Sequence, residues 1–362
     1  MKLRIILLAA GFAMLLSCSN RQEKSRHEAE HFRTEVMLRT TPVKNQGQDQ
    51  LCWIYAMLAT IETEHLMQGD SIDLSVAYMA RQLLAEQARM VYAKGRRHHV
   101  SLRGMSTKAL LLLHRYGAMP YTSYRMPENI DLSGLALKMQ RSGEQAKAHL
   151  TGLAKLDEQT GKTLDDAIGG LPYWVFMLGC QYTPLEFAHS ICAKDEYLAL
   201  TSFSHHPFGE SFVLEVPDND HQDAFFNVPI DSLMRYVEHS LRTGHPVCWE
   251  GDTSEPGCDF HQGIARLPQG HKPISQESRQ QGFDHAKTTD DHCMAIVGIA
   301  RDDEGRRYYI CKNSWGTGNP YGGYMYMEED YLKAKTIAVI IPTAALPTMD
   351  QMIKGLRPES LF

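Results

Sequence analysis

The chain has 362 residues, of which 43% are hydrophobic and 22% are charged, so it has the composition and the length of a folded globular protein with one large or two modest domains. Its formal net charge is -6, and no run of Lys or Arg exceeds two residues. This excludes the electrostatic footprint of a nucleic-acid-binding protein, and we expect no nucleic-acid partner.

The N-terminus combines positive charge at Lys2 and Arg4 with a short apolar stretch over residues 5–16. That stretch is too short to span a bilayer comfortably. It ends in Leu15-Leu16-Ser17-Cys18, which resembles the bacterial lipobox, in which the cysteine is lipidated. Residues 1–18 are therefore interpreted as a lipoprotein signal peptide with Cys18 as the lipidation site. A simple cleaved signal or a buried N-terminal helix are the alternatives.

Residues 19–35 are polar and predict a tether between the anchor and the folded part. The lipid anchor implies a bacterial cell-envelope location, and the lack of an acidic cluster after Cys18 favours the periplasmic face. No later stretch is long and apolar enough to span a membrane.

The first half of the chain predicts helices. Residues 52–66 are almost continuously apolar, and residues 74–92 and 107–116 have apolar side chains at helical spacing. The helical pattern continues over residues 132–189, with an interruption at residues 169–172. We therefore expect residues 36–205 to form a mainly helical lobe with a helical insertion.

The second half predicts a β-rich lobe over residues 206–345, followed by a tail over residues 346–362. It contains short β-branched or aromatic runs with turn residues between them. These runs are residues 211–216, 246–251, 292–300, 307–312, 323–327 and 336–341. One helix is expected over residues 230–243. The fold class is α+β, with a cleft between a helical and a β-rich lobe.

Eight cysteines raise the question of disulfides and metals. The sequence does not define a connectivity, but Cys293 and Cys311 lie in apolar strand-like runs, where an unpaired thiol packs as a small hydrophobe. There is no Cys-x-x-Cys pair and no His-Glu-x-x-His helix, and the histidine pairs at 98–99 and 205–206 lie in polar segments. We expect no metal site.

Cys52 stands at the predicted start of a buried helix, after a glutamine-rich loop over residues 42–50. The partial positive charge at a helix N-terminus favours the thiolate, which is the reactive form of cysteine. Cys52 is therefore the candidate nucleophile.

A cysteine nucleophile needs a base and a group that orients the base. His292 begins one predicted strand, and Asn313 closes the next, twenty-one residues later. A turn over residues 302–306 would make the two strands neighbours and bring both side chains together.

These residues occur in segments that resemble the papain family of cysteine peptidases. The matching segments are Asn45-Gln46-Gly47, Cys52-Trp53, His292, Asn313-Ser314-Trp315-Gly316 and Gly322-Gly323-Tyr324, in the order of that family. The resemblance implies a two-lobed papain-like fold with the active site in the cleft, peptide substrates and no cofactor.

The resemblance also implies roles. Cys52 would attack the peptide carbonyl, His292 would accept and return the proton, and Asn313 would orient the ring. Trp315 would shield the contact between His292 and Asn313 from water, with Trp53 as a second supporting residue. Gln46 would form the oxyanion hole with the N–H of Cys52, and each such donor is worth ~10²–10³ in rate.

Within the family, the chain is most similar to the bleomycin hydrolase and bacterial aminopeptidase C type over roughly residues 37–341. Supporting segments include Leu200-Thr201-Ser202-Phe203 and Gly244-His245-Pro246-Val247. Residues 346–352 faintly resemble the ending by which bleomycin hydrolases limit cleavage to free N-termini. An aminopeptidase-like activity is therefore implied, and the rings formed by bleomycin hydrolases make an oligomer conceivable.

Three residues depart from the family pattern. Gln50 stands where the family has glycine, Leu51 adds bulk beside it, and both are predicted to narrow the substrate cleft. Asp49 could cap the helix or oppose thiolate formation. These departures motivate an alternative function, a catalytically weak or inactive papain-like lipoprotein that binds peptides. Glu62 and Glu64 are expected at the exposed end of the nucleophile helix.

Overall fold

The computed structural model describes residues 29–349 together with residues 351 and 352. The chain divides into a unit of residues 1–30 and a unit of residues 31–362, and the following description concerns the second unit. The predicted signal segment, Cys18 and most of the predicted tether lie outside the described residues. Among the helices of the described part, none combines the length and hydropathy that crossing a membrane requires.

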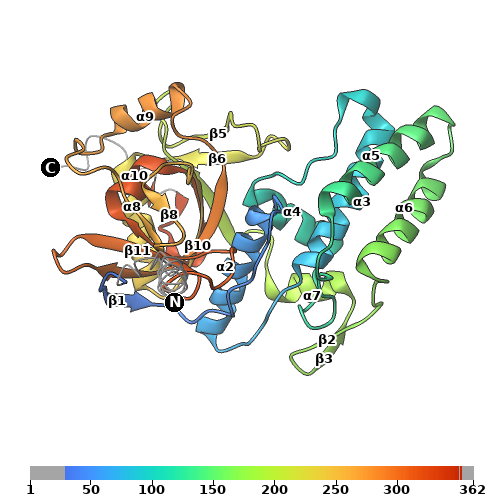
Figure 1. Cartoon of the computed structure of the whole chain (residues 1–362), viewed down its shortest axis with the longest axis horizontal. Coiled ribbons are helices and arrows are strands. Elements are labelled where there is room, and N and C mark those ends of the chain that lie inside the picture. The colour runs from blue at the N-terminus through green and yellow to red at the C-terminus, as the bar shows by residue number, and fades with distance from the viewer. Residues whose placement is uncertain (1–28, 350, 353–362) are drawn as a thin grey trace, which may run out of the picture. The chain divides into compact units, whose positions relative to one another are not determined.

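Helices dominate the first half of the described chain, as the periodicity predicted. They are α2 (Cys52–Gln68), α3 (Val76–Lys94), η1 (Gly95–Arg97), α4 (Ser106–Tyr116), α5 (Leu132–Ala148), α6 (Leu153–Ile168) and α7 (Pro184–Ile191). Helix α2 is apolar on all sides because it packs against α3 and α4 on one side and the sheet on the other (Figure 1). It ends at Gly69, whose φ of 105° is left-handed.

One part of the helical prediction is wrong. Residues 175–182 form a small hairpin, β2 (Val175–Met177) and β3 (Cys180–Tyr182), within the segment predicted as helix. The glycines and the proline of residues 169–172 end α6, and Leu178 and Gly179 have positive φ values of 52° and 78°. A turn with two positive φ values matches the twist of paired strands, so the chain forms a hairpin here.

The second half contributes to a sheet that has eleven strands in the described part of the chain. Ten of them follow the order β5-β6-β4-β13-β7-β10-β11-β12-β9-β8, and the eleventh, β1, pairs with β10. The strands are β1 (Arg33–Met37), β4 (Tyr197–Thr201), β5 (Ser211–Val213), β6 (Ala224–Asn227), β7 (Val247–Gly251), β8 (Cys258–Asp259), β9 (Ile264–Ala265), β10 (His292–Arg301), β11 (Arg307–Lys312), β12 (Tyr324–Glu328) and β13 (Thr336–Pro342). The β-rich prediction is confirmed for every run proposed from the sequence.

Two predicted boundaries shift. The strand β1 includes residues 33–35, which the sequence assigned to the tether, and β4 joins the sheet from within the predicted helical lobe. Strand β1 is mostly exposed, so its sequence has no apolar alternation that would reveal a strand.

The sheet carries a hydrophobic core on each face. The face toward α2 presents Cys248 and Cys293, and the other face packs α8 (Ile230–Arg242) through Leu233 and Val237. Two further helices, α9 (Gln276–Asp284) and α10 (Glu329–Lys335), complete the lobe together with the short η2 (Thr343–Ala345). This arrangement sets the N-terminus of α2 against the start of β10.

Candidate active site

Cys52 is the first residue of α2, as the sequence predicted. Leu51, which precedes it, provides no side-chain cap, so Asp49 does not cap the helix. The uncapped N–H groups of the first turn therefore keep their partial positive charge beside the thiol. Burial, and after it the nearby Asp131, raises the pKa of Asp49, which weakens its opposition to a thiolate.

His292 and Asn313 form the expected pair. His292 opens β10, Asn313 directly follows β11, and the two strands are antiparallel neighbours. The distance from His292 Nε2 to Asn313 Oδ1 is 2.8 Å, and the residues are only 4% and 3% exposed. Because an amide oxygen only accepts, Nε2 donates here and Nδ1 is left to exchange a proton with Cys52.

The electrostatics favour a thiolate–imidazolium pair. A hydrogen bond from Cys293 lowers the pKa of Cys52 well below its ordinary value, and the hydrogen bond and charge of His292 add to this against the effect of burial. Burial opposes protonation of His292, but the interactions with Cys52 and Asn313 outweigh it and raise the pKa of the ring. Both shifts place the proton on His292 rather than on Cys52.

Cys293 is a neighbour of the nucleophile that sequence reasoning treated only as apolar packing. It is unpaired, as is Cys311, and it is 7% exposed in the core against which Cys52 packs. Burial first, and then the nearby Cys52, raise the pKa of Cys293 well above its ordinary value. Cys293 therefore keeps its hydrogen and donates it to the Cys52 thiolate.

Trp315 lies beside His292, and Gln46 is hydrogen-bonded to Ser314, the residue that follows Asn313. The ring of Trp315 is 4.3 Å from that of His292, centroid to centroid, and it covers the buried histidine. The Ser314 hydroxyl donates to Gln46 Oε1 over 2.6 Å, and Gln46 Nε2 donates to the carbonyl of Asp49, also over 2.6 Å. One of the two hydrogens on Nε2 remains for an oxyanion.

Neither Gln50 nor Leu51, the two predicted cleft residues, lines the pocket that contains Cys52 or the larger pocket beside Gln46. Leu51 is completely buried in the hydrophobic core, so the prediction that it narrows the cleft is wrong: the residue before a helix that is buried all round faces the core as well. Gln50 is exposed. Trp53 is buried, and its indole N–H donates to the carbonyl of Leu102 over 2.9 Å, which fixes the segment that follows Leu102.

A small pocket of about 10 Å³ contains the nucleophile and the histidine. Its lining residues come from five separate segments and are Cys52, Gly104, Met105, Asp218, Glu250, Asp290, Asp291, His292 and Cys293. Arg103 crosses beside it, with Nε donating to Asp218 over 2.6 Å and Nη2 donating to the carbonyl of Asp290 over 3.2 Å. Sequence reasoning missed this acidic wall, although a glutamate in the apolar run 246–251 was a visible signal.

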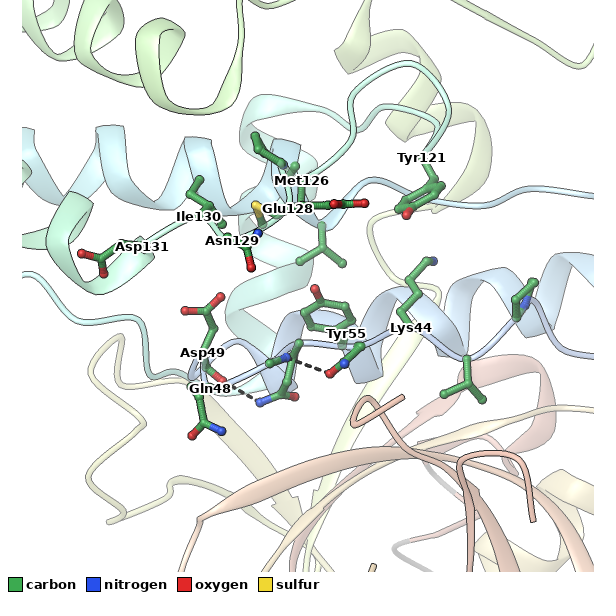
Figure 2. A pocket seen from close by; sticks show the side chains of 18 of the residues that line it. Lys44, Gln48, Asp49, Tyr55, Tyr121, Met126, Glu128, Asn129, Ile130 and Asp131 are labelled. Carbon is green, nitrogen blue, oxygen red and sulfur yellow. Dashed lines mark hydrogen bonds between the residues drawn. The ribbon is translucent and has the colours of Figure 1, made fainter. Parts of the chain in front are cut away.

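A larger pocket, of about 960 Å³, lies beside the loop that precedes Cys52. Figure 2 shows Lys44, Gln48 and Asp49 on one side of it and Tyr121 and the segment 126–131 on the other. Gln46 lines this pocket, whereas Cys52 and His292 do not. The space therefore adjoins the reactive residues without containing them.

The loop beside the large pocket is anchored by buried charges. Glu62 is fully buried, contrary to the expectation that it lies at an exposed helix end, and accepts from Lys44 over 2.7 Å and from the N–H of Leu74 over 2.7 Å. Burial opposes its ionisation, but Lys44 and then Lys312 outweigh this and lower the pKa of Glu62. Glu64 is also buried and pairs with His245 over 2.8 Å.

Among the described residues, His205, His206 and Glu215 form the one group with a spacing that could hold a metal ion. Gln280 directs Nε2 at Nδ1 of His205 over 3.0 Å, and its Oε1 is held by the N–H of Ser204 over 2.6 Å. The hydrogen of neutral His205 therefore lies on Nε2, which faces Glu215 and which a metal would need. The contacts favour hydrogen bonds over metal binding.

Comparisons with known proteins found a matching family model and similar relatives. A model of the Peptidase C1-like family matches residues 176–360, slightly more than half of the chain. Aminopeptidase G of Lactobacillus delbrueckii subsp. lactis is 23% identical over 416 residues, which cover 99% of this chain and 94% of the relative. Aminopeptidase E of Lactobacillus helveticus is 24% identical over 398 residues, which cover 94% of this chain and 89% of the relative.

A solved structure shares the fold. The crystal structure of PepW from Lactobacillus rhamnosis HN001 superposes with a TM-score of 0.67 at 17% identity, covering 89% of this chain and 84% of that one. The α+β, papain-like architecture predicted from the sequence is confirmed.

Proposed function

The chain belongs to the Peptidase C1-like family of cysteine peptidases, and on this basis we propose that Cys52, His292, Asn313 and Gln46 release single residues from the free N-termini of peptides. The observation that carries the proposal is the placement of Cys52 at the start of α2 against His292, which Asn313 holds at 2.8 Å.

The first half-reaction forms an acyl-enzyme. The Cys52 thiolate attacks the scissile carbonyl carbon, and the resulting oxyanion accepts hydrogen bonds from Gln46 Nε2 and from the backbone N–H of Cys52, which has no acceptor within the helix. His292 then gives its proton to the leaving amine as the C–N bond breaks. A thioester between Cys52 and the N-terminal residue remains.

The second half-reaction reverses these roles. His292, now neutral, takes a proton from water, and the water oxygen attacks the thioester carbonyl. The C–S bond breaks, the free amino acid leaves, and the Cys52 thiolate and the His292 imidazolium are restored. Asn313 keeps the ring in one orientation throughout, because its oxygen continues to accept from Nε2.

Two observations support the aminopeptidase mode. The relatives that align over nearly their whole length are named aminopeptidases. The contact between Arg103 and Asp218 lies beside the small pocket, where it would obstruct a chain that extends in the N-terminal direction. The large pocket beside Gln46 has room for the part of the peptide that follows the scissile bond.

The C-terminal tail does not carry the proposal. Met352 is 2% exposed and packs into the hydrophobic cluster that contains α8. Asp350 and residues 353–362 lie outside the described residues. The selectivity for free N-termini is therefore assigned to the pocket rather than to the tail.

The test uses the purified full-length chain under reductant with one peptide in two forms, with a free and with an acetylated N-terminus. We expect mass spectrometry to show the loss of single N-terminal residues from the free form only, and no product with Cys52→Ala. Internal cleavage of both forms would identify an endopeptidase. Absence of turnover, with Cys52 unreactive toward a thiol-directed epoxide, would favour the alternative of a peptide-binding protein.

The proposal includes the lipid anchor on Cys18 and an envelope location. Its support is the sequence Leu15-Leu16-Ser17-Cys18. Metabolic labelling with palmitate in a bacterial host should label the wild-type chain and send it to the membrane fraction. Cys18→Ser should abolish both labelling and membrane association, and an unchanged distribution would refute the anchor.

A further inference from the structure

Glu250 is a buried carboxylate at the wall of the small pocket. It is 2% exposed, and it lies on β7 opposite Cys293 of β10. Like Cys248, two residues earlier on the strand, it is on the sheet face toward α2. Its side chain is thus brought to the nucleophile by the sheet rather than by nearness in sequence.

The two carboxylate oxygens of Glu250 have different surroundings. Oε1 accepts from the N–H of Ser106, the first residue of α4, and so replaces the side-chain cap that this helix lacks. Oε2 is buried and has no hydrogen-bond partner among the residues that the structure describes. Burial raises the pKa of Glu250 to about 7. A buried acceptor without a donor destabilises a fold, so an unpaired Oε2 in the lining of a pocket points to a ligand.

The charges around the pocket leave room for one cation. Arg103 neutralises Asp218, and Asp291 accepts from the N–H and the hydroxyl of Thr253. Among the described residues, neither Glu250 nor Asp290 forms an ion pair: Asp290 accepts from the N–H of Asp218 over 3.0 Å, and burial raises its pKa to about 6 although the charge of Arg103 acts in the opposite direction. His292 balances the Cys52 thiolate and not these two groups.

The position fits the α-ammonium group of a peptide. Two covalent bonds join this nitrogen to the carbonyl carbon of the first residue, so it lies about 2.5 Å from the atom that Cys52 attacks. With Cys52 Sγ roughly 3–3.5 Å from that carbon, the nitrogen must lie in the space adjoining Cys52. The pocket of about 10 Å³ has the size of a single water molecule, which an –NH₃⁺ group matches and a further residue exceeds.

We propose that Oε2 of Glu250, with Asp290 beside it, binds the α-ammonium group of the substrate's first residue. The inference rests on the proposed aminopeptidase function and names the group that selects its substrates. The pair of Arg103 and Asp218 beside the pocket would obstruct longer N-terminal extensions, and Glu250 would attract an ammonium group but not a neutral or acylated N-terminus.

Glu250→Gln is the decisive variant, because a glutamine keeps Oε1 for the N–H of Ser106 and removes only the charge. The substrates are an alanyl anilide and its lactyl counterpart, in which a hydroxyl replaces the ammonium at equal size. We expect Glu250→Gln to lower kcat/KM for the alanyl substrate by about 10–100-fold, mainly through KM, and to leave the lactyl substrate unchanged. Glu250→Asp should restore part of the preference.

Controls separate this inference from the general effect of charge. Glu64→Gln removes a buried negative charge from the far end of α2 and should keep the preference of the wild type. On the high-pH plateau, where Cys52 is a thiolate in both proteins, the rate of its alkylation by iodoacetamide should be equal in wild type and Glu250→Gln. If Glu250→Gln does not fold, Asp290→Asn tests the same wall and should also reduce the preference.

The outcomes distinguish the two proposals. A wild-type chain that requires Cys52 and prefers the alanyl substrate, with the same preference in Glu250→Gln and Asp290→Asn, would overturn this inference and leave the aminopeptidase function intact. If the wild type hydrolyses neither substrate, the proposed function fails, and protection of Cys52 from alkylation then decides the ammonium site. Alaninamide should protect and lactamide should not; equal protection would overturn the site.

Discussion

Two spaces adjoin the start of α2, and they differ in nearly every property that decides what can bind. The space beside Gln46 measures about 960 Å³ and contains neither Cys52 nor His292. The space beside Cys52 measures about 10 Å³ and contains both, together with four carboxylates. Under the proposed function, the large space would hold the peptide that follows the scissile bond, and the small space would hold only the N-terminal ammonium group.

Of the residues in the small pocket other than Cys52, His292 is expected to contribute most to the rate of hydrolysis. With His292→Ala, no group remains to protonate the leaving amine, and kcat/KM should fall by ~10³-fold or more. Steady-state hydrolysis of an alanyl anilide measures the loss. The matched control is His245→Ala, which removes the partner of Glu64 near the C-terminal end of α2. Its kcat/KM should stay within a few-fold of the wild-type value. A His292→Ala enzyme that retains a tenth of the activity would refute the assignment.

The wall of the roomy space depends on Glu62, which is fully buried between Lys44 and Lys312. Glu62→Gln leaves the buried Lys312 without an anion and Lys44 with Asp73 alone, and should lower the free energy of unfolding by ~3–5 kcal/mol. Urea denaturation followed by circular dichroism measures it. Asp157→Asn breaks an exposed pair with Arg89 and should cost no more than about 1 kcal/mol. Equal losses in the two variants would contradict the role of burial.

Under the proposed function, the side chain of Arg103 obstructs peptides that extend past the small pocket in the N-terminal direction. Arg103→Ala removes the contact with Asp218 and opens a path in the N-terminal direction, so cleavage of N-acetylated peptides should rise about tenfold relative to free ones, equivalent to ~1.4 kcal/mol. Arg89→Ala, on the exposed helical surface, should leave the ratio unchanged. A constant ratio in Arg103→Ala would show that another barrier closes this side.

Cys293, in the small pocket, sets the pH range over which Cys52 is a thiolate. Its hydrogen bond is the first cause of the lowered pKa of Cys52, so Cys293→Ala should raise that pKa and shift the rise of alkylation rate to higher pH. A lowered thiol pKa gives thiolate at every pH above it, so alkylation near pH 6 should slow several-fold while the plateau at high pH persists. Cys293→Ser retains a donor and should restore the profile. Superimposable profiles for wild type and Cys293→Ala would contradict this.

The smallest effect is expected on the roomy side. Tyr121 lines the large pocket, and Tyr121→Ala should raise KM about fivefold for peptides of four or more residues, equivalent to ~1 kcal/mol of lost contact. Aminoacyl anilides, which do not reach the pocket, should be unaffected. Tyr173→Ala, at a side chain that is 74% exposed, is the control. Equal effects on short and long substrates would assign the pocket another role.

The sequence predicted where Cys52, His292 and Asn313 lie because their signals are local. A cysteine that starts an apolar run predicts its own helix terminus, and His292 and Asn313 predict their own contact because one short turn joins their strands. The strand bounds were also recovered where apolar runs are strong, as in β10 and β11.

The proximity of the carboxylates in the small pocket could not be predicted from the sequence in the same way. Asp218, Glu250 and Asp290 come from three segments whose proximity depends on the order of strands in the sheet, which sequence patterns do not specify. Leu51 was misplaced because one residue of displacement at a helix start changes which way a side chain points. Strand β1 was missed because its side chains are mostly exposed.

The pairing of β1 with β10 limits how far the folded part can move from the proposed membrane anchor. Arg33, the first residue of β1, is 15 residues after Cys18 (33 − 18 = 15) and pairs with the end of the strand that begins with His292. A fully extended segment of this length reaches roughly 50 Å. With the proposed lipid on Cys18, the Arg301 end of β10 would stay within that distance of the bilayer and His292 within roughly 80 Å, so the density of substrate in a layer at the membrane, rather than its bulk concentration, would set the encounter rate.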